Sequence, residues 1–330
     1  MSDTYGYGSH PTSLMGLSDG ELYAMYRGEN WFSMDEFARL ELLQETVNRA
    51  ASQNGELGSC RVEFVKMDHN TAGRQYGDVI QLNREMYVDD LRLANYNGQL
   101  IQTPLQDSNL HALTTVLHED QHAYQNQIIN GVIQASDSSV RQEYAANNFG
   151  VVQVLQNDGL LRTGSTYLSG NTPGVGYYLY YFQSTERDAH RFSEEKTAYI
   201  MDYLTTEYGN EPSFDMYRTE LRANGYDATV SKAKEIFGDI NIDHEINQSL
   251  MNHYYHTFEP VNAQINALVQ VEMINSYEAM MRPELSNNTH SDNGMREAQG
   301  VSSSYPNLTD GTDNESVTSS NESSYGIGME

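Results

Sequence analysis

The sequence contains little cysteine and little positive charge. Of its 330 residues only Cys60 is a cysteine, which excludes an intramolecular disulfide and any zinc site built on paired cysteines. Lys and Arg total 19 against 46 Asp and Glu, so the formal net charge at pH 7 is −27. Proteins bind nucleic acids and anionic membranes through Lys and Arg. We therefore expect neither as a partner.

Long apolar runs are also missing. No run approaches the ~18 residues that a membrane-spanning helix needs. Residues 1–20 lack the basic and apolar regions of a secretory signal peptide. The 24 Tyr, 14 Met and 9 Phe residues are nevertheless enough to fill a core. We expect a folded cytoplasmic protein in a reducing compartment, and the sequence gives no prediction of its oligomeric state.

Composition divides the chain into three parts. Residues 1–20 are rich in Ser, Gly, Tyr and Thr without any periodicity, which predicts a mobile N-terminal arm. Residues 283–330 are acidic and rich in Ser, Thr and Asn. Such a segment has too little apolar surface to offset the entropy cost of ordering it, so we predict a disordered tail. Residues 21–282 form the predicted folded body.

The pattern of the body predicts an α+β fold. A helix is expected over about Met34–Ser52, because Ser33 and Glu36 form a capping box and apolar residues recur at helical spacing. A second helix is expected over about Asn109–Asn130. Strand-like runs, which can form a hairpin across a turn-rich segment, lie at Arg61–Met67 and Tyr76–Asn83. We therefore expect a small sheet in the N-terminal half, packed on the second helix, and a mostly helical C-terminal half.

The most informative segment is His118-Glu119-Asp120-Gln121-His122, inside the second predicted helix. Residues four apart lie on one helical face, so both imidazoles can reach one metal ion. Glu119 projects beside that face and can take a proton from a metal-bound water without being a ligand. Two imidazole ligands in this arrangement favour Zn²⁺. The motif predicts a zinc site with an adjacent general base.

A third ligand is required, and the sequence offers two candidates. Glu143 lies 21 residues after His122, and Glu186 lies 64 residues after it. The segment of Glu186 includes Ala189, which is small enough for two helices to pack closely, and close packing brings a carboxylate to a metal held by another helix. Glu143 fits an ordinary exposed helix carboxylate. We favour Glu186 as the third ligand and keep Glu143 as the alternative.

These residues resemble a known family. The motif helix together with Glu186-Arg187-Asp188-Ala189-His190-Arg191-Phe192 is similar to the gluzincin-type zinc metallopeptidases. The similarity is greatest to the ImmA/IrrE-like group and related phage- and toxin-associated zincins, which pair a His-Glu-x-x-His helix with a Glu-x-x-Ala-x-x-Phe helix. In that group a strand ending in Leu-Asn precedes the motif helix, as Leu82-Asn83 does here. The resemblance covers about residues 61–195 and leaves 196–282 as a helical extension.

The resemblance implies that His118, His122 and Glu186 are ligands and that Glu119 is the general base. The family pattern often has an Asp four residues after the third ligand, where this chain has His190. Asp188 can instead orient a ligand histidine, and it fits equally well a solvated acid on the helix face.

The sequence therefore predicts a zinc-dependent metallopeptidase that hydrolyses peptide bonds in a peptide or protein substrate. We expect about one zinc per chain, because no second set of ligands is evident, and an extended substrate along a sheet edge at Tyr76–Asn83. One alternative is a zincin-fold regulatory or binding protein with a structural or inactive metal site. Another is a helical interaction protein in which the motif arose by chance. Substrate specificity does not follow from the sequence.

Overall fold

The computed structural model describes residues 7–148 except 70, 97–98 and 136, together with 160–163, 166–169, 178 and 181–237. This part of the chain is mixed α+β, which confirms the predicted fold class. The helices are α1 (Asp19–Ala24), α2 (Gly28–Trp31), α3 (Glu36–Asn54), α4 (Arg84–Tyr87), α5 (Ser108–Ile129), α6 (Ser138–Asn148), α9 (Ser184–Tyr208), α10 (Pro212–Asn224) and α11 (Tyr226–Phe237). The strands are β1 (Arg61–Val65), β2 (Gly73–Tyr76), β3 (Val79–Asn83), β4 (Leu91–Tyr96), β5 (Gln99–Pro104), β6 (Leu160–Thr163) and β7 (Thr166–Ser169). The predicted tail at 283–330 lies outside the described residues.

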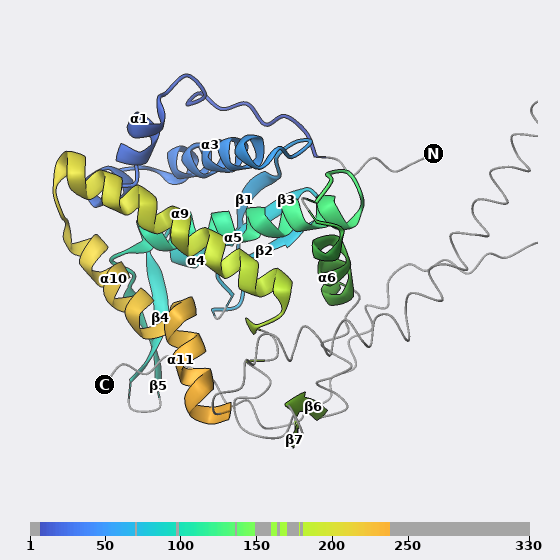
Figure 1. Ribbon diagram of the computed structural model, residues 1–330. Coiled ribbons are helices and arrows are strands. Elements are labelled where there is room, and N and C mark those ends of the chain that lie inside the picture. The colour runs from blue at the N-terminus through green and yellow to red at the C-terminus, as the bar shows by residue number, and fades with distance from the viewer. Residues whose placement is uncertain are drawn as a thin grey trace, which may run out of the picture. The chain divides into compact units, whose positions relative to one another are not determined.

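Helix α5 lies in the middle of the fold and carries the His-Glu-x-x-His motif (Figure 1). It packs against α9, α3 and the strands β2 and β3. The apolar stripe predicted for this helix is buried: Leu110 and Leu113 are 0% exposed and Leu117 is 3% exposed. A Cβ added at Gly73 would lie 2.7 Å from Cγ2 of Thr115, so the glycine allows β2 to approach α5 closely. The motif helix is therefore held by core packing along most of its length.

The small sheet beside α5 has the strand order β1-β3-β2. Strands β1 and β3 are parallel, with Val62 opposite Ile80, and β2 is antiparallel to β3. The expected hairpin between Arg61–Met67 and Tyr76–Asn83 is therefore wrong. The hairpin instead joins β2 to β3 through Gly77, whose φ of 60° favours glycine. This topology puts β3 in the interior of the sheet and β2 at its edge.

Helix α3 begins two residues later than the sequence indicated. The predicted capping box joined Ser33 to Glu36, but the N-cap is Asp35, whose carboxylate accepts a hydrogen bond from the backbone N–H of Ala38 at 2.9 Å. Ser33 instead donates to the carbonyl oxygen of Asn30. Asp and Ser are equally good N-cap residues, so the local pattern did not distinguish the two positions.

Residues 7–20 lie against α3 and the start of β1, where composition predicted a mobile arm. Gly8 forms an isolated antiparallel bridge with Ser59. Thr12 donates from Oγ1 to Oε2 of the buried Glu45 at 2.7 Å. Ser18 is the N-cap of α1 and forms a capping box with Glu21. Small polar residues attach this segment through hydrogen bonds, and Tyr7 and Leu14 pack against the core, although the composition of the segment resembles that of a mobile one.

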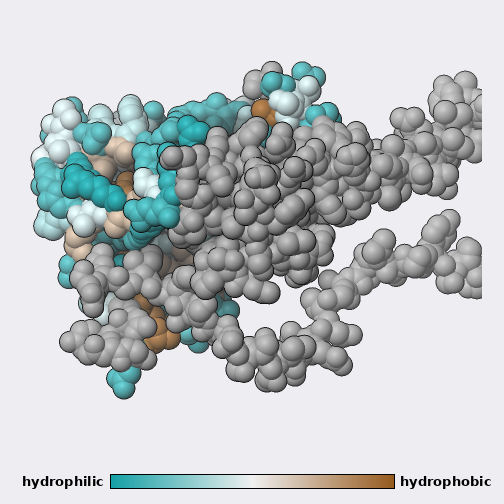
Figure 2. Space-filling model, turned by 60° about the horizontal axis from the view of Figure 1, so that its bottom comes forward, coloured by the Kyte–Doolittle hydropathy of each residue, from teal (hydrophilic) through white to brown (hydrophobic). Residues whose placement is uncertain are grey.

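The C-terminal half of the described chain is helical, as predicted. Helix α9 packs along α5, and α10 contacts both α5 and α11 (Figure 1). The remainder of the predicted helical extension, 238–282, lies outside the described residues. Within the described part no helix is both long and apolar enough to cross a membrane. The described surface in Figure 2 is predominantly hydrophilic, with small hydrophobic areas.

Candidate metal centre

Two helices bring the three predicted metal ligands together. His118 and His122 are one turn apart on α5, and Glu186 lies in the first turn of α9. The start of α9 is fixed on α5 because Nε2 of Gln125 donates to the carbonyl oxygen of Thr185 at 2.8 Å. The side chains of the three ligands are 14%, 18% and 12% exposed, respectively. The cluster is thus largely buried but reachable from solvent.

The ligand atoms have separations that suit a tetrahedral zinc ion. Nε2 of His118 lies 3.1 Å from Nε2 of His122 and 3.4 Å from Oε2 of Glu186. Nε2 of His122 lies 3.6 Å from Oε1 of Glu186. Ligand atoms about 2.0–2.2 Å from a tetrahedral ion are about 3.3–3.6 Å apart. Two imidazoles and one carboxylate at these separations fit Zn²⁺.

The electrostatics of Glu186 also suit a metal ligand. Burial alone would raise the pKa of its carboxyl, but His118 and His122 outweigh this effect and lower the pKa well below its ordinary value. The carboxylate is therefore ionised at neutral pH. Its Oε2 is buried, and its contact with Nε2 of His118 at 3.4 Å is too long for a good hydrogen bond. A buried anionic oxygen with so weak a partner is stabilised when a cation lies between it and the histidines.

Gln125 orients His122, a role that the sequence analysis did not assign. Nδ1 of His122 lies 2.9 Å from Oε1 of Gln125, so the Nδ1–H donates there and Nε2 faces the cluster. Gln125 is 1% exposed, and its amide group also holds Thr185. Partners of this kind fix the tautomer of a ligand histidine and raise its affinity for metal. In the sequence, this role is indicated only by the position of Gln125 three residues after His122, which places both side chains on one face of the helix.

Glu119 lies beside the cluster but is not one of its ligands. It is 7% exposed, and burial raises the pKa of its carboxyl, while His118 and His122 oppose that effect. The backbone N–H of Gln75, on β2, donates to the Glu119 carboxylate. A raised pKa makes a carboxylate a better proton acceptor near neutral pH. The predicted general base therefore sits in an environment that suits proton transfer.

His190 is a further member of the cluster, and the sequence gave it no role. Its ring centroid lies 4.5 Å from that of His118 and 4.4 Å from that of Tyr181, on which it stacks. His118, Glu186 and His190 offer ligand atoms that all lie within 4.8 Å of one another. Burial, followed by the charge on His118, lowers the pKa of His190 to about 3, so its ring is neutral at pH 7. In the sequence, the feature that indicates a place for His190 in the cluster is its position one helical turn after Glu186.

The alternative ligand and the proposed orienting acid have other contacts. Oε1 of Glu143, on α6, lies 3.5 Å from Nη1 of Arg187, and Glu143 is not a member of the cluster. Oδ2 of Asp188 accepts a hydrogen bond from the Tyr144 hydroxyl at 2.9 Å, and its Oδ1 accepts one from Nε of Arg187 at 2.7 Å. Asp188 therefore holds α6 and α9 together and does not orient a ligand histidine.

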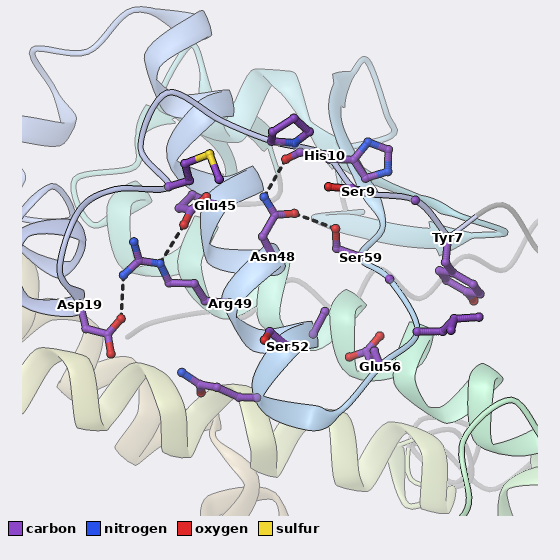
Figure 3. Close-up of a pocket in the computed structure, with 17 residues that line it drawn as sticks. Tyr7, Ser9, His10, Asp19, Glu45, Asn48, Arg49, Ser52, Glu56 and Ser59 are labelled. Atoms are coloured by element: carbon purple, nitrogen blue, oxygen red, sulfur yellow. Dashed lines mark hydrogen bonds and ion pairs between the residues drawn. The ribbon is translucent and has the colours of Figure 1, made fainter.

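A pocket of about 650 Å³ lies away from this cluster, between residues 7–19 and the second half of α3 (Figure 3). Its polar groups are largely paired with one another. Arg49 donates to Asp19 at 2.7 Å and to Glu45 at 2.9 Å, and Ser59 donates to Asn48 at 2.6 Å. The bond between Arg49 and Asp19, together with one from Nδ2 of Asn48 to the carbonyl oxygen of His10 at 2.7 Å, attaches the N-terminal segment to α3. The pocket contains none of the predicted catalytic or ligand residues.

Comparison with known proteins gives no further assignment. No family model, no curated protein and no solved structure matches the chain.

Proposed function

We propose that this protein is a zinc-dependent metallopeptidase. One observation carries the proposal: the ligand atoms of His118, His122 and Glu186 lie 3.1–3.6 Å apart, and the buried Glu119 carboxylate lies beside them. A zinc site with a purely structural role has no use for the adjacent base. The substrate class is a peptide or protein, and no nucleic acid or membrane partner is proposed.

Each residue of the centre has a separate role in the proposed reaction. The three ligands would hold Zn²⁺, which would supply a Lewis acid that polarises a peptide carbonyl and lowers the pKa of water. Glu119 accepts the proton of the attacking water and then donates it to the leaving amine nitrogen. Gln125 keeps His122 in the tautomer that directs Nε2 to the ligand position. Burial of Glu119 supports its role because it raises the pKa of the carboxyl.

Strand β2 is the sheet edge best suited to an extended substrate. The sequence analysis favoured Tyr76–Asn83, but most of that segment is the interior strand β3. Because the backbone N–H of Gln75 donates to Glu119, this edge of β2 faces the base. An extended peptide that pairs with such an edge gains main-chain hydrogen bonds. It would thereby bring a peptide bond close to Glu119.

Replacement of the base tests the proposal. We expect Glu119→Gln to keep both fold and zinc while peptide cleavage falls by about 10²–10⁴-fold, because only the proton acceptor is lost. Cleavage is first detected with a diverse peptide library and mass spectrometry. Glu143→Gln is the matched control, since it makes the same change outside the cluster and should cleave as the wild type does. Equal cleavage by wild type and Glu119→Gln would refute the mechanism.

One observation favours a second candidate function. His190 offers a nitrogen within 4.8 Å of the ligand atoms of His118 and Glu186. A fourth protein ligand would occupy the position that water needs and close the site, as in structural zinc sites. The protein would then be a zincin-fold binding or regulatory protein. Stoichiometric zinc without cleavage of any library peptide would favour this alternative, whereas absence of zinc would favour a chance motif in a helical interaction protein.

A further inference from the structure

A second group of side chains with metal-ligand chemistry lies near the start of α5. Asp107 directly precedes the helix, His111 lies in its first turn, and Glu220 belongs to α10. His111 precedes His118 by two helical turns, which separates the two positions by about 10 Å along the axis. The sequence predicts no second ligand set, because His111 and Glu220 are 109 residues apart and no local motif joins them.

The separations of the three ligand atoms suit one metal ion. Nε2 of His111 lies 3.0 Å from Oε2 of Glu220 and 3.5 Å from Oδ2 of Asp107. All three ligand atoms lie within 4.8 Å of one another. The distances from the imidazole are close to the ~3.3–3.6 Å expected between ligands of a tetrahedral ion. The geometry thus resembles that of the first cluster, although the residues come from different elements.

Asp107 provides an independent reason to expect a cation here. Its side chain is 3% exposed, and its Oδ1 is buried without a hydrogen-bond partner among the described residues. A buried carboxylate with an unpartnered oxygen is costly unless a cation lies nearby. His111 and Glu220 are 18% and 21% exposed, so an ion and a water molecule can reach the cluster from solvent.

The charges of the cluster limit the kind of ion. Two carboxylates balance a divalent cation, and one imidazole nitrogen favours a transition metal such as Zn²⁺ or Mn²⁺ over Mg²⁺ or Ca²⁺. Nη1 of Arg92, on β4, lies 3.8 Å from Oε2 of Glu220 and is the neighbouring cation with which the metal must compete. The rings of Tyr217 and His111 form a T-shaped pair with centroids 5.6 Å apart, which limits movement of the imidazole.

We propose that Asp107, His111 and Glu220 form a second divalent metal site, which binds a zinc-class ion and joins the start of α5 to α10. The site is separate from the proposed catalytic centre and does not rest on the proposed activity. Its three protein ligands leave one position for water. The ion would link residues that are 109 positions apart in the chain, at the start of α5 and on α10, and would thereby stabilise the packing of these two helices.

Zinc stoichiometry of the full chain tests this proposal. The protein is freed of metal with a chelator, and Zn²⁺ is titrated calorimetrically into the wild type and into variants whose fold is checked by circular dichroism. We expect two equivalents in the wild type and one each in His111→Ala, Glu220→Gln and His118→Ala. The double variant His111→Ala/His118→Ala should bind none. The control His69→Ala, which removes an exposed histidine, should keep both.

The variants separate this proposal from the proposed catalytic centre. Loss of one equivalent in His111→Ala and Glu220→Gln supports the second site whether or not His118→Ala also loses one. If both variants bind as many equivalents as the wild type, the second site is refuted. Should His111→Ala fail to fold, Glu220→Gln decides the question, since it keeps the size of the side chain and removes only its charge.

Discussion

The ring of His190 lies against the ring of His118, with centroids 4.5 Å apart and planes inclined by 59°. His190 comes one turn after Glu186 on α9, so a single helix supplies both a carboxylate and an imidazole to the cluster. The distance of His190 from the metal therefore decides whether the centre has an open position for water or is closed by four protein ligands.

We expect His190→Ala to keep one zinc at the cluster, with weaker binding, whereas His122→Ala should lose it. The reason is that Nε2 of His122 lies 3.1 Å from that of His118 and 3.6 Å from Oε1 of Glu186, whereas the contact of His190 with His118 is between the rings, with centroids 4.5 Å apart. Zinc competition with a chromogenic chelator measures both variants. Equal losses in the two variants would indicate a closed, four-ligand site and would favour the binding-protein alternative.

The two candidates for the third ligand can be compared directly. Glu186→Ala should remove zinc from the cluster, because its carboxylate faces both histidines at 3.4 and 3.6 Å. Glu143→Ala should keep it, since that carboxylate pairs with Arg187. Metal analysis after dialysis gives the result. Loss of zinc in the Glu143 variant and retention in the Glu186 variant would reverse the ligand assignment.

Asp120 is expected to destabilise the protein at neutral pH. It is 0% exposed, neither of its oxygens has a hydrogen-bond partner among the described residues, and burial followed by the nearby Glu56 raises its pKa. Because this pKa is higher in the folded than in the unfolded protein, the free energy of unfolding decreases as the pH rises. Asp120→Asn should therefore be more stable at pH 7.5 by about 1–3 kcal/mol.

Urea unfolding at two pH values tests the role of the Asp120 charge. Below about pH 3 the carboxyl is protonated in both the folded and unfolded states, so the difference between wild type and Asp120→Asn should shrink there. A variant that is less stable than the wild type at pH 7.5 would show that the ionised Asp120 is favourably paired.

His111 should stabilise the metal-free protein more at pH 6 than at pH 9.5. Burial alone would lower its pKa, but Asp107 and Glu220 raise it to about 9, with Arg92 as the other charged neighbour. Because the folded pKa lies above the unfolded value of about 6.5, the stabilisation is complete below pH 6.5 and is lost as the pH rises through 9.

The comparison needs wild type and His111→Gln, both unfolded with urea in the presence of EDTA so that no metal competes with the proton. The stability difference between them should fall on the order of 1–3 kcal/mol between pH 6 and pH 9.5. A difference that stays constant over this range would show that the imidazole is neutral or that its charge is not paired in the folded state.

The sequence predicted those parts of the site that depend on local spacing. His118, Glu119 and His122 follow from the helical repeat of α5, and the prediction of Glu186 required only that a second helix pack closely. His190 and Gln125 were missed because their contacts depend on how α9 lies on α5. The local pattern contains no information on that orientation.

The fold shows the same division between local and long-range information. The apolar stripe of α5 and the helical C-terminal half were predicted from periodicity. The segments of β1 and β3 were expected to pair as an antiparallel hairpin, but they are parallel, because β2 precedes β3 and forms the hairpin with it. The hydrophobic patterns of β1 and β3 are the same for either direction. The turn of the hairpin between β2 and β3 contains Gly77, whose φ is positive. A glycine in the sequence does not by itself show that its φ is positive.

The hydrogen bond between Gln125 and Thr185 spans 60 residues of chain, and this separation has a consequence for biosynthesis. The ribosome adds about 5–20 residues per second, so the start of α9 emerges roughly 3–12 s after the motif helix. During that interval a nascent chain carries both histidines and the base but lacks the carboxylate ligand. For the proposed peptidase, the order of translation thus delays competence until α9 has docked, which protects neighbouring nascent chains from cleavage.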